Sequence, residues 1–492
     1  MNKILLSIIA VFMSVSCSST LTEVKITNSV INGGYLGNGA EWDPYCEADM
    51  WGAPMTPEMW NKIFERTDFM KMSIVRCMIS SPFRYFNAKT QEYEKERNSE
   101  SLKTLLSYCQ KNNIIVMFGE FNPPNRKLKL DAKWVKMSVN YLNYLVIESG
   151  FTCIKYYIPT NEPDGYWSVY DGDYNAYLEL VRMFQNEIAN YPNLALHIKL
   201  AGPDVVLDYK NSKYDLTTKD RVDLAAKQID SIIGIYEIHA YPGYYQVSNG
   251  IFTKMLKEVV ASVPKGKKLV LGEAGYKTWR KEDSTRNMTH LEKLSKTPLI
   301  VSKEGADCNM NVYDFQYGID MSLLAIEVMN NGGSGVCPWM LDDSHSFGDK
   351  GNIHNVKIWG MWNIFGGKLW KMPQEENIRP WYYAWSLMCR YFPSGSDILK
   401  VDMPDIAGLK ITASISDNKL TVALLNISDQ KRFLNLALPV ALANAKLYLY
   451  KEGNRNLFEN MPPKPDKTGI KAENHLKVEI SPNSLIVISD YD

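Results

Sequence analysis

Several features are missing from this 492-residue sequence, and each absence excludes a class of protein. It has no excess of charge, because 55 Lys and Arg balance 55 Asp and Glu. A general nucleic-acid binder usually carries a basic surplus, so we expect no nucleic-acid partner. Beyond the N-terminal segment, no run reaches the ~18 consecutive apolar residues of a membrane helix. The remaining composition, with 45% hydrophobic and 22% charged residues, is typical of a folded globular protein.

Motifs for metal and nucleotide binding are also missing. The six histidines form no HxH or HExxH pattern and the eight cysteines form no CxxC, so we expect no metal site and no cofactor. The segment Gly37-Asn38-Gly39 lacks the third glycine and the following helix of a dinucleotide-binding turn. Eight cysteines less Cys17 leave seven, and an odd number excludes complete intramolecular pairing. Cys77 and Cys337 lie in apolar runs, which is typical of buried free thiols.

The N-terminal residues resemble a bacterial lipoprotein signal. Lys3 precedes an apolar run of ten residues, 4–13, which is too short to span a bilayer. The small residues Ser14-Val15-Ser16 then precede Cys17, as in a lipobox. We therefore expect residues 1–16 to be a signal peptide and Cys17 to be diacylated, with no other membrane contact. This predicts an extracytoplasmic, outer-membrane lipoprotein; an ordinary signal peptide followed by a chance cysteine is the alternative.

Short apolar runs alternate with helical patterns over residues 33–393, as in repeated βα units. This rhythm predicts the α/β class and a (β/α)₈ TIM barrel, with a doubly wound open sheet as the rival. The eight expected strands are 35–42, 73–79, 114–120, 154–160, 197–202, 234–241, 268–273 and 335–341. Thr56-Pro57 predicts the start of a helix at 58–70, and apolar residues spaced three and four apart predict helices at 101–111, 173–189 and 313–329.

The rhythm changes in the last hundred or so residues, 394–492. Short alternating strands without an intervening amphipathic helix predict a C-terminal β-sandwich. The expected strands are 409–415, 419–426, 432–438, 446–451, 475–480 and 484–489. Residues 21–31 also have a strand pattern, so we expect the segment 17–32 to join the sandwich. Two long loops, 276–311 and 342–380, should lie at the C-terminal face of the barrel, where active sites sit.

Two glutamates stand where expected barrel strands end. Glu162 follows Asn161 at the end of the fourth strand, and Glu273 ends the seventh. Glycoside hydrolysis needs two carboxyl groups across one pocket. One must be protonated to donate to the leaving oxygen, and the other must be ionised to attack the sugar or activate water. Mutual repulsion helps to separate the two pKa values and so to assign the roles.

The Asn-Glu-Pro that ends strand four, combined with a glutamate ending strand seven, resembles clan A of the glycoside hydrolases. A barrel followed by a β-sandwich resembles families 30 and 39 of that clan in particular, and family 5 is also similar. The resemblance implies a retaining double displacement, with Glu162 as general acid/base and Glu273 as nucleophile. It also implies that Asn161 binds the sugar 2-hydroxyl.

Four further residues fit supporting positions of the clan: Arg76, His239, Tyr241 and Trp339. The resemblance implies that the His-x-Tyr pair positions the nucleophile, that the arginine lies near it, and that the tryptophan lies under the reactive sugar. A buried Arg76 must be paired, and either Glu237 or Glu273 could be its partner. His239 and Trp339 could instead be core residues.

Other strand ends and loops supply weaker candidates for the substrate site. Trp42, between Glu41 and Asp43, ends strand one and could shape the donor sugar pocket. Glu120 ends strand three and could hydrogen-bond substrate. Candidates for the rim of the site come from the two long loops: Trp279, His345 and Trp359.

We therefore expect a glycosidase that cleaves a poly- or oligosaccharide, with other glycan-utilisation proteins as partners. The retaining mechanism predicts carboxyl groups of Glu162 and Glu273 about 5–5.5 Å apart. A lipoprotein that only binds glycans on the same barrel is the alternative. A barrel enzyme of metal-assisted chemistry would need clustered ligands that the sequence does not show.

Overall fold

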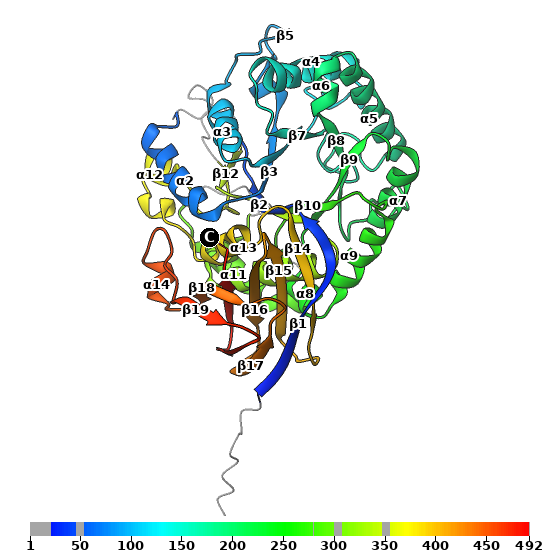
Figure 1. Ribbon diagram of the computed structural model, residues 1–492. Coiled ribbons are helices and arrows are strands. Elements are labelled where there is room, and N and C mark those ends of the chain that lie inside the picture. The colour runs from blue at the N-terminus through cyan, green and yellow to red at the C-terminus, as the bar shows by residue number, and fades with distance from the viewer. Residues whose placement is uncertain (1–20, 46–53, 279, 300–307, 347–354, 492) are drawn as a thin grey trace, which may run out of the picture.

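The computed structural model describes residues 21–45, 54–278, 280–299, 308–346 and 355–491 (Figure 1). Cys17 and Trp279 lie outside these residues, and so does the expected signal peptide. Eight parallel strands form a closed barrel, which confirms the predicted fold and excludes the open doubly wound sheet. In order around the barrel they are β10 (Leu269–Ala274), β11 (Gly335–Pro338), β2 (Gly37–Glu41), β3 (Ile74–Ile79), β6 (Ile115–Glu120), β7 (Ile154–Ile158), β8 (Lys199–Val206) and β9 (Ile233–Ala240).

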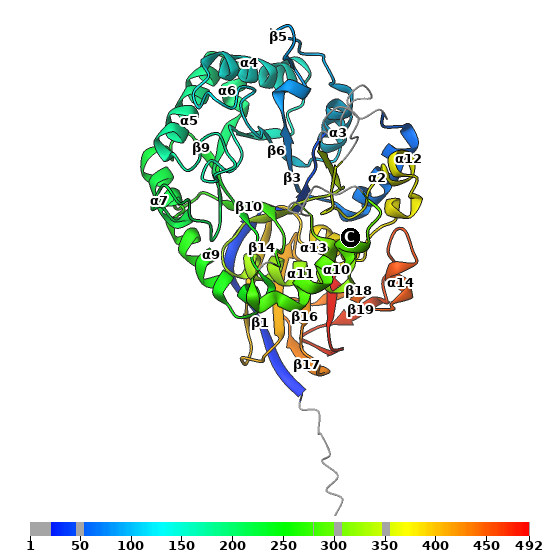
Figure 2. The ribbon, with the colours of Figure 1, turned by 180° about the vertical axis from the view of Figure 1, so that it is seen from behind.

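Helices surround the barrel, and the view from behind shows the ring that they form (Figure 2). The longer helices are α2 (Pro57–Met70), α3 (Glu100–Lys111), α4 (Ala132–Asn143), α5 (Tyr174–Ala189), α7 (Thr218–Gln228), α9 (Ile251–Ser262), α10 (Ser284–Lys296), α11 (Phe315–Asn330) and α13 (Trp381–Arg390). Shorter ones are α6 (Pro192–His197), α8 (Tyr244–Ser248), α12 (Gly366–Trp370) and α14 (Arg455–Phe458). Within the described residues, no helix is both long and apolar enough to cross a membrane.

Short elements complete the connections. Single turns of 3₁₀-helix occur at η1 (Ser81–Phe83), η3 (Lys281–Asp283), η5 (Met310–Tyr313) and η6 (Pro373–Glu376), and η2 (Tyr144–Glu148) is π-helical. Two small hairpins pair β4 (Phe86–Asn87) with β5 (Glu92–Tyr93) and β12 (Ser344–Ser346) with β13 (Asn355–Lys357). One expected boundary is wrong: His197 ends helix α6, and the fifth barrel strand begins at Lys199.

Local signals in the sequence explain where helices begin. The Thr56 hydroxyl accepts a hydrogen bond from the backbone N–H of Met59, and Pro57 occupies the first turn of α2. Asp173 caps α5 in the same way, through the N–H of Ala176. Cys77 and Cys337 are buried free thiols, as the sequence predicted.

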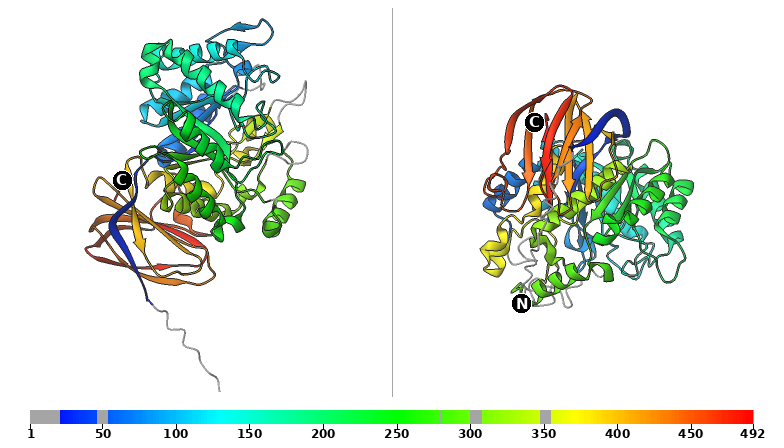
Figure 3. Two further views of the ribbon diagram at one scale, coloured as in Figure 1. Left: turned by 90° about the vertical axis from the view of Figure 1, so that its right-hand side faces the viewer. Right: turned by 90° about the horizontal axis from the view of Figure 1, so that it is seen from below.

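The C-terminal strands form one nine-stranded sheet together with the N-terminal strand β1 (Leu21–Tyr35) (Figure 3). Its order is β19 (Lys467–Ala472), β18 (Leu442–Tyr450), β21 (Ser484–Ser489), β16 (Lys419–Asn426), β15 (Leu409–Ser416), β14 (Ser396–Asp402), β1, β17 (Arg432–Ala437) and β20 (His475–Ile480). Both halves of the sheet contribute side chains to one apolar core, so the sheet folds over into a sandwich. The sequence patterns did not predict β14 and β19.

Strand β1 joins the two halves of the sandwich. It pairs antiparallel with β14 on one side and parallel with β17 on the other. Register shifts between Ile26 and Tyr35 bend its pairing with β14, as β-bulges do. Val24 and Ile26 are buried in the shared core, while Lys25 between them is exposed. The expectation that residues 21–31 form a strand of the sandwich is therefore confirmed.

The sandwich packs against helix α11 of the barrel. Every residue of this helix from Tyr317 to Met329 is buried, because the barrel covers one side and the sandwich the other. The Tyr450 ring stacks on Phe315 at 4.4 Å, and its hydroxyl donates to the Phe315 carbonyl at 2.7 Å. A Cβ at position 318 would lie 2.3 Å from the Tyr450 hydroxyl, so Gly318 permits this contact.

We predict that Ile26→Ala destabilises the sandwich, because it removes buried apolar contacts where β1 holds both halves together. Loss of a buried isoleucine side chain costs about 2–5 kcal/mol of the free energy of unfolding. Thermal unfolding measures this, and the matched control is Lys25→Ala, whose side chain points to solvent on the opposite face. An equal unfolding midpoint for both variants would contradict the role given to β1.

Candidate active site

The two glutamates predicted from the strand ends face each other at the C-terminal end of the barrel. A carboxylate oxygen of Glu162 lies within 4.8 Å of one of Glu273, and the His239 ring lies against both. Its Nδ1 is 2.7 Å from Glu162 Oε1 and 3.4 Å from Glu273 Oε2. This spacing is close to the ~5–5.5 Å of retaining enzymes and shorter than the ~6.5–9.5 Å of inverting ones.

Glu162 is held by its own backbone. It follows β7 in the left-handed region, with φ of 44°, a conformation that is uncommon for a residue with a side chain. Its N–H donates to Asp204 Oδ1 at 2.7 Å, which fixes the turn from the neighbouring strand β8. The carboxyl group is partly exposed, and the indole N–H of Trp167 donates to its Oε2 at 2.5 Å.

Arg76 connects the residues of the site. It lies on β3, is fully buried, and donates four hydrogen bonds through its two terminal nitrogens. The acceptors are Glu273 Oε1 (2.6 Å), Glu41 Oε2 (2.7 Å), Asn161 Oδ1 (2.7 Å) and Asp204 Oδ2 (3.0 Å). Glu237 lies farther away, at 3.9 Å from Nε, so Glu273 is the closer of the two partners considered for Arg76. Burial would lower the pKa of this arginine, but the surrounding carboxylates raise it well above its usual value.

Glu273 accepts a strong hydrogen bond on each oxygen. Arg76 binds Oε1, and the Tyr241 hydroxyl donates to Oε2 at 2.6 Å. These two contacts hold the carboxyl group of Glu273 in one orientation, towards the centre of the site. The ring of His239, from the same His-x-Tyr segment, contacts both members of the pair and lies closer to Glu162 than to Glu273.

A second pair of buried acids lies behind His239. Its Nε2 is 3.2 Å from Glu237 Oε1 and 3.5 Å from Asp204 Oδ1. Burial, then repulsion by Asp204, raises the pKa of Glu237 to about 8. Burial opposes ionisation of Asp204 as well, but His239 and Arg76 lower its pKa well below the usual value. Burial also works against the charged His239, yet Glu273, Asp204 and Glu237 raise its pKa.

At neutral pH these shifts favour the neutral form of Glu237 and the ionised form of Asp204. Gly272 on β10 makes room for Glu237, because a Cβ there would lie 1.6 Å from Glu237 Oε1.

Two groups of three residues have the spacing of metal ligands: Glu162, His239 and Glu273, and Asp204, Glu237 and His239. The positive charge that a metal would bring is already supplied by the Arg76 guanidinium, which lies within 4 Å of Glu273, Asp204 and Glu237. The expectation of a site without a metal stays a prediction.

Aromatic side chains line one side of the glutamate pair. Trp339 contacts Phe121 edge to face at 6.4 Å and lies in a cluster with Trp359 and Tyr241. Tyr241, which packs against this cluster, is the residue whose hydroxyl binds Glu273. Trp359, considered for the rim, is only 3% exposed and packs edge-on against Tyr241 at 5.8 Å, so that expectation is wrong. The side chain of His345 lies outside the described parts.

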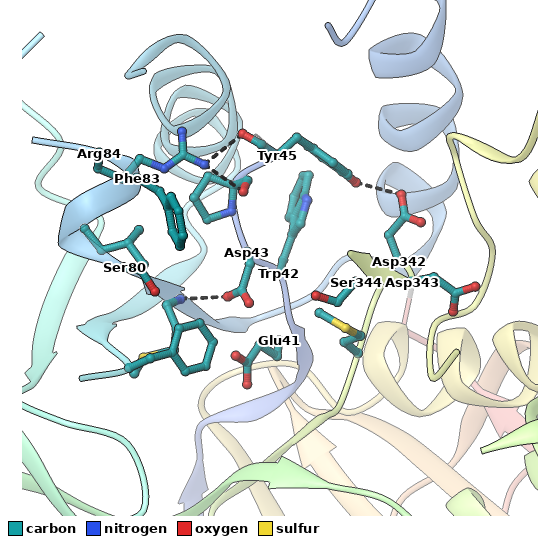
Figure 4. A pocket seen from close by; sticks show the side chains of 15 residues that line it. Glu41, Trp42, Asp43, Tyr45, Ser80, Phe83, Arg84, Asp342, Asp343 and Ser344 are labelled. Atoms are coloured by element: carbon teal, nitrogen blue, oxygen red, sulfur yellow. Dashed lines mark hydrogen bonds between the residues drawn. The ribbon is translucent and has the colours of Figure 1, made fainter. Parts of the chain in front are cut away.

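A cavity of about 110 Å³ opens beside Glu41 and has acidic walls (Figure 4). Asp342 and Asp343 also line the cavity. The Tyr45 hydroxyl donates a hydrogen bond to Asp342, and the Arg379 guanidinium donates to Asp343. Asp43 Oδ1 accepts from the Met78 backbone N–H, and burial raises the pKa of Asp43 to about 7. Within the described residues, Oε1 of Glu41 has no hydrogen-bond partner. The cavity therefore offers Glu41 and Asp43 for hydroxyl groups of a ligand.

Trp42 lines the same cavity, as expected for the end of strand one. It is only 1% exposed, and its ring contacts Tyr108 of α3 edge to face at 5.7 Å. Most of the indole therefore belongs to the core between barrel and helices.

The expectation for Glu120 is wrong. Successive side chains of a strand point to opposite faces, and Glu120 points out of the barrel towards α4. It accepts hydrogen bonds from Tyr85, Trp134 and Ser138 and is 1% exposed. This network satisfies the carboxyl group inside the wall of the barrel, away from Glu162 and Glu273.

Sequence reasoning also missed residues of the site. Asp204 accepts a hydrogen bond from the Glu162 backbone N–H and so fixes the turn there. The sequence could have identified it, because it is an acidic residue near the end of the fifth barrel strand, as Glu162 and Glu273 are at the ends of theirs. Trp167 stands five residues after Glu162, but no periodicity places its indole against that carboxylate. Such a contact depends on the conformation of the loop after β7.

Solved structures with a similar fold are known, but no family model and no curated protein matches the sequence. Among solved structures, this chain is similar to a family 30 endoxylanase from Clostridium papyrosolvens C71, with TM-score 0.61, 14% identity and coverage of 96% of this chain and 100% of that one. A family 51 α-L-arabinofuranosidase from Bifidobacterium longum gives TM-score 0.63, 12% identity and coverage of 96% and 100%. A family 39 β-xylosidase from Caulobacter crescentus gives TM-score 0.59 and 10% identity, with coverage of 96% of this chain and 100% of that one.

The fold of this chain is therefore shared with these glycoside hydrolases, as the resemblance in the sequence implied. At identities of 10–14%, the likeness concerns the barrel and its sandwich alone.

We predict that the raised pKa of Glu237 makes the stability of the protein depend on pH. The group keeps its proton in the folded state up to about pH 8 but loses it above about pH 4.5 when unfolded. The stability that this proton contributes is complete below pH 4.5 and is lost as the pH rises through 8. Glu237→Gln stays neutral at every pH, so its thermal midpoint should decline less than that of the wild type over this range.

The matched control for this measurement is Glu473→Gln, at an exposed position of the sandwich. Its unfolding midpoint should follow the wild type at every pH. Parallel curves for the wild type and Glu237→Gln would contradict the protonated state assigned to Glu237.

Proposed function

We propose that this protein is a retaining glycosidase in which Glu273 is the nucleophile and Glu162 the general acid/base. The observation that carries the proposal is the different surroundings of two carboxyl groups at short range. Glu273 is buried and accepts from Arg76 and Tyr241, which stabilise the anion. Glu162 is more exposed and can reach the oxygen of a leaving group.

The first step forms a bond between a carboxylate oxygen of Glu273 and the anomeric carbon of the sugar. The bond from that carbon to the glycosidic oxygen breaks, and the proton of Glu162 moves to this oxygen. In the second step Glu162 takes a proton from water. The water oxygen attacks the anomeric carbon and releases Glu273. Asn161, held by Arg76 through its carbonyl, is the candidate for the sugar 2-hydroxyl.

The substrate in this proposal is a poly- or oligosaccharide. Similar folds carry the names xylanase, xylosidase and arabinofuranosidase, all of which act on carbohydrate. The Glu41 and Asp43 carboxyl groups of the acidic cavity supply hydrogen bonds to the donor ring, and Trp339 supplies its apolar contact. Lipidation of Cys17 would hold the enzyme at the outer membrane, alongside other glycan-utilisation proteins.

We predict that Glu273→Gln abolishes hydrolysis of aryl glycosides and polysaccharides, because the amide cannot form the glycosyl ester. Glu162→Gln should lower kcat/KM by about 10²–10⁴-fold, the usual contribution of general acid catalysis, and least for leaving groups that need no proton. A 2-fluoro glycoside should label Glu273. Activity of Glu473→Gln should equal that of the wild type.

Unchanged turnover in either site variant would contradict the assigned roles. If the wild type hydrolyses nothing across a broad glycan panel yet binds a glycan, the alternative of a binding lipoprotein replaces the enzyme.

We predict that Cys17→Ser moves the protein from the membrane fraction to the soluble fraction, because the serine cannot carry the diacylglycerol thioether. Fractionation and labelling with radioactive palmitate measure this. Incorporation of palmitate into Cys17→Ser, or none into the wild type, would contradict the lipoprotein assignment.

A further inference from the structure

Three aromatic side chains gather beside the glutamate pair without any role in the proposed chemistry. Tyr166 is 74% exposed and Trp167 38%, and their rings are 5.0 Å apart. Tyr209, half-buried, lies 5.0 Å from Trp167 on the other side. Most large apolar side chains of this chain are buried, so a group of exposed rings indicates a binding surface.

The group is attached directly to the proposed acid/base. The indole N–H of Trp167 donates to Glu162 Oε2 at 2.5 Å. A Cβ at position 165 would lie 2.3 Å from the Trp167 ring, so the indole packs closely on the backbone of Gly165. The Tyr166 N–H also points to the Tyr209 hydroxyl, at 3.4 Å. The rings are therefore held next to the atom that protonates the leaving oxygen.

The position of the group in the barrel separates it from the acidic cavity. Tyr166 and Trp167 follow β7, and Tyr209 follows β8. The cavity is formed at the ends of β2, β3 and β11. In the closed order of strands, β7 and β8 lie opposite β11 and β2. A sugar in the cavity and a ring on the aromatic side would therefore lie on opposite sides of the glutamate pair.

We propose that Tyr166, Trp167 and Tyr209 form a subsite for the sugar that leaves on cleavage. Flat aromatic faces bind the apolar face of a pyranose ring, and the hydroxyls of Tyr166 and Tyr209 serve its polar edge, while the indole N–H of Trp167 stays on Glu162. The substrate is then an oligosaccharide that continues beyond the scissile bond, and a glycoside of a small aglycone uses the site incompletely. This inference rests on the proposed function and names its substrate class more closely.

The experiment compares paired substrates that share one donor sugar. The pairs are 4-nitrophenyl β-xyloside with xylotriose, 4-nitrophenyl β-glucoside with cellotriose, and 4-nitrophenyl α-L-arabinofuranoside with arabinotriose. For the pair that the wild type cleaves, Tyr166→Ala should lower the ratio of kcat/KM for the oligosaccharide to that for the aryl glycoside by roughly 3- to 10-fold. Trp167→Ala should lower it at least as much, and Trp167→Phe, which keeps a ring, should restore most of it.

The matched control is Leu196→Ala. Leu196 is 81% exposed on α6, before the N-terminal end of β8 and so at the face of the barrel away from the site. Its ratio should equal that of the wild type. An unchanged ratio in both Tyr166→Ala and Trp167→Ala overturns the subsite while leaving the glycosidase itself intact.

A wild type that cleaves neither member of any pair contradicts the proposed function, and binding then tests the subsite. Calorimetry with the same three oligosaccharides on Glu273→Gln should give saturable binding that weakens when Tyr166→Ala is added. Binding that is absent, or that is equal with and without Tyr166→Ala, overturns the subsite.

Discussion

The buried guanidinium of Arg76 is the interaction on which the site depends. Six carboxyl groups converge at the C-terminal end of the barrel: Glu41, Asp43, Glu162, Asp204, Glu237 and Glu273. Among the described residues, Arg76 and His239 are the basic side chains that lie between them. Burial of an unpaired charge costs several kcal/mol, so the group cannot be ionised throughout. His239 and Arg76 therefore lower the pKa of Asp204, while burial raises the pKa values of Glu41, Asp43 and Glu237.

The same constraint ties the two proposed catalytic groups together. Arg76 binds Glu273 directly and reaches Glu162 through Asp204, which accepts the Glu162 backbone N–H. The His239 ring contacts both carboxyl groups and so links them a second time. A change in charge at one glutamate is therefore felt by the other through rigid, buried groups. Such coupling is what an acid/base needs when its partner gains and loses a covalent bond.

Periodicity predicted the barrel because apolar runs and helical faces repeat along the chain, and strand ends predicted Glu162 and Glu273 because parallel strands end at one face. The failures have physical causes. Glu120 was misassigned because a continuously apolar strand does not reveal which of its faces points inwards. Asp204 and Trp167 act through contacts between separate loops and strands, which spacing along one chain does not encode. Strand β14 was missed because apolar and polar residues do not alternate strictly along it, and its neighbouring residues Ile398 and Leu399 are both buried.

The two sides of the glutamate pair differ in a way that suits the proposed reaction. The side at β2 and β11 is acidic, and Glu41 Oε1 has no hydrogen-bond partner among the described residues, so it can bind a hydroxyl of the donor ring. The side at β7 and β8 is aromatic and exposed. Interactions that accelerate the reaction must strengthen in the transition state, and directed hydrogen bonds to the donor ring can do so. Stacking on the leaving sugar changes little during the reaction, so it serves to select a chain and hold it in place.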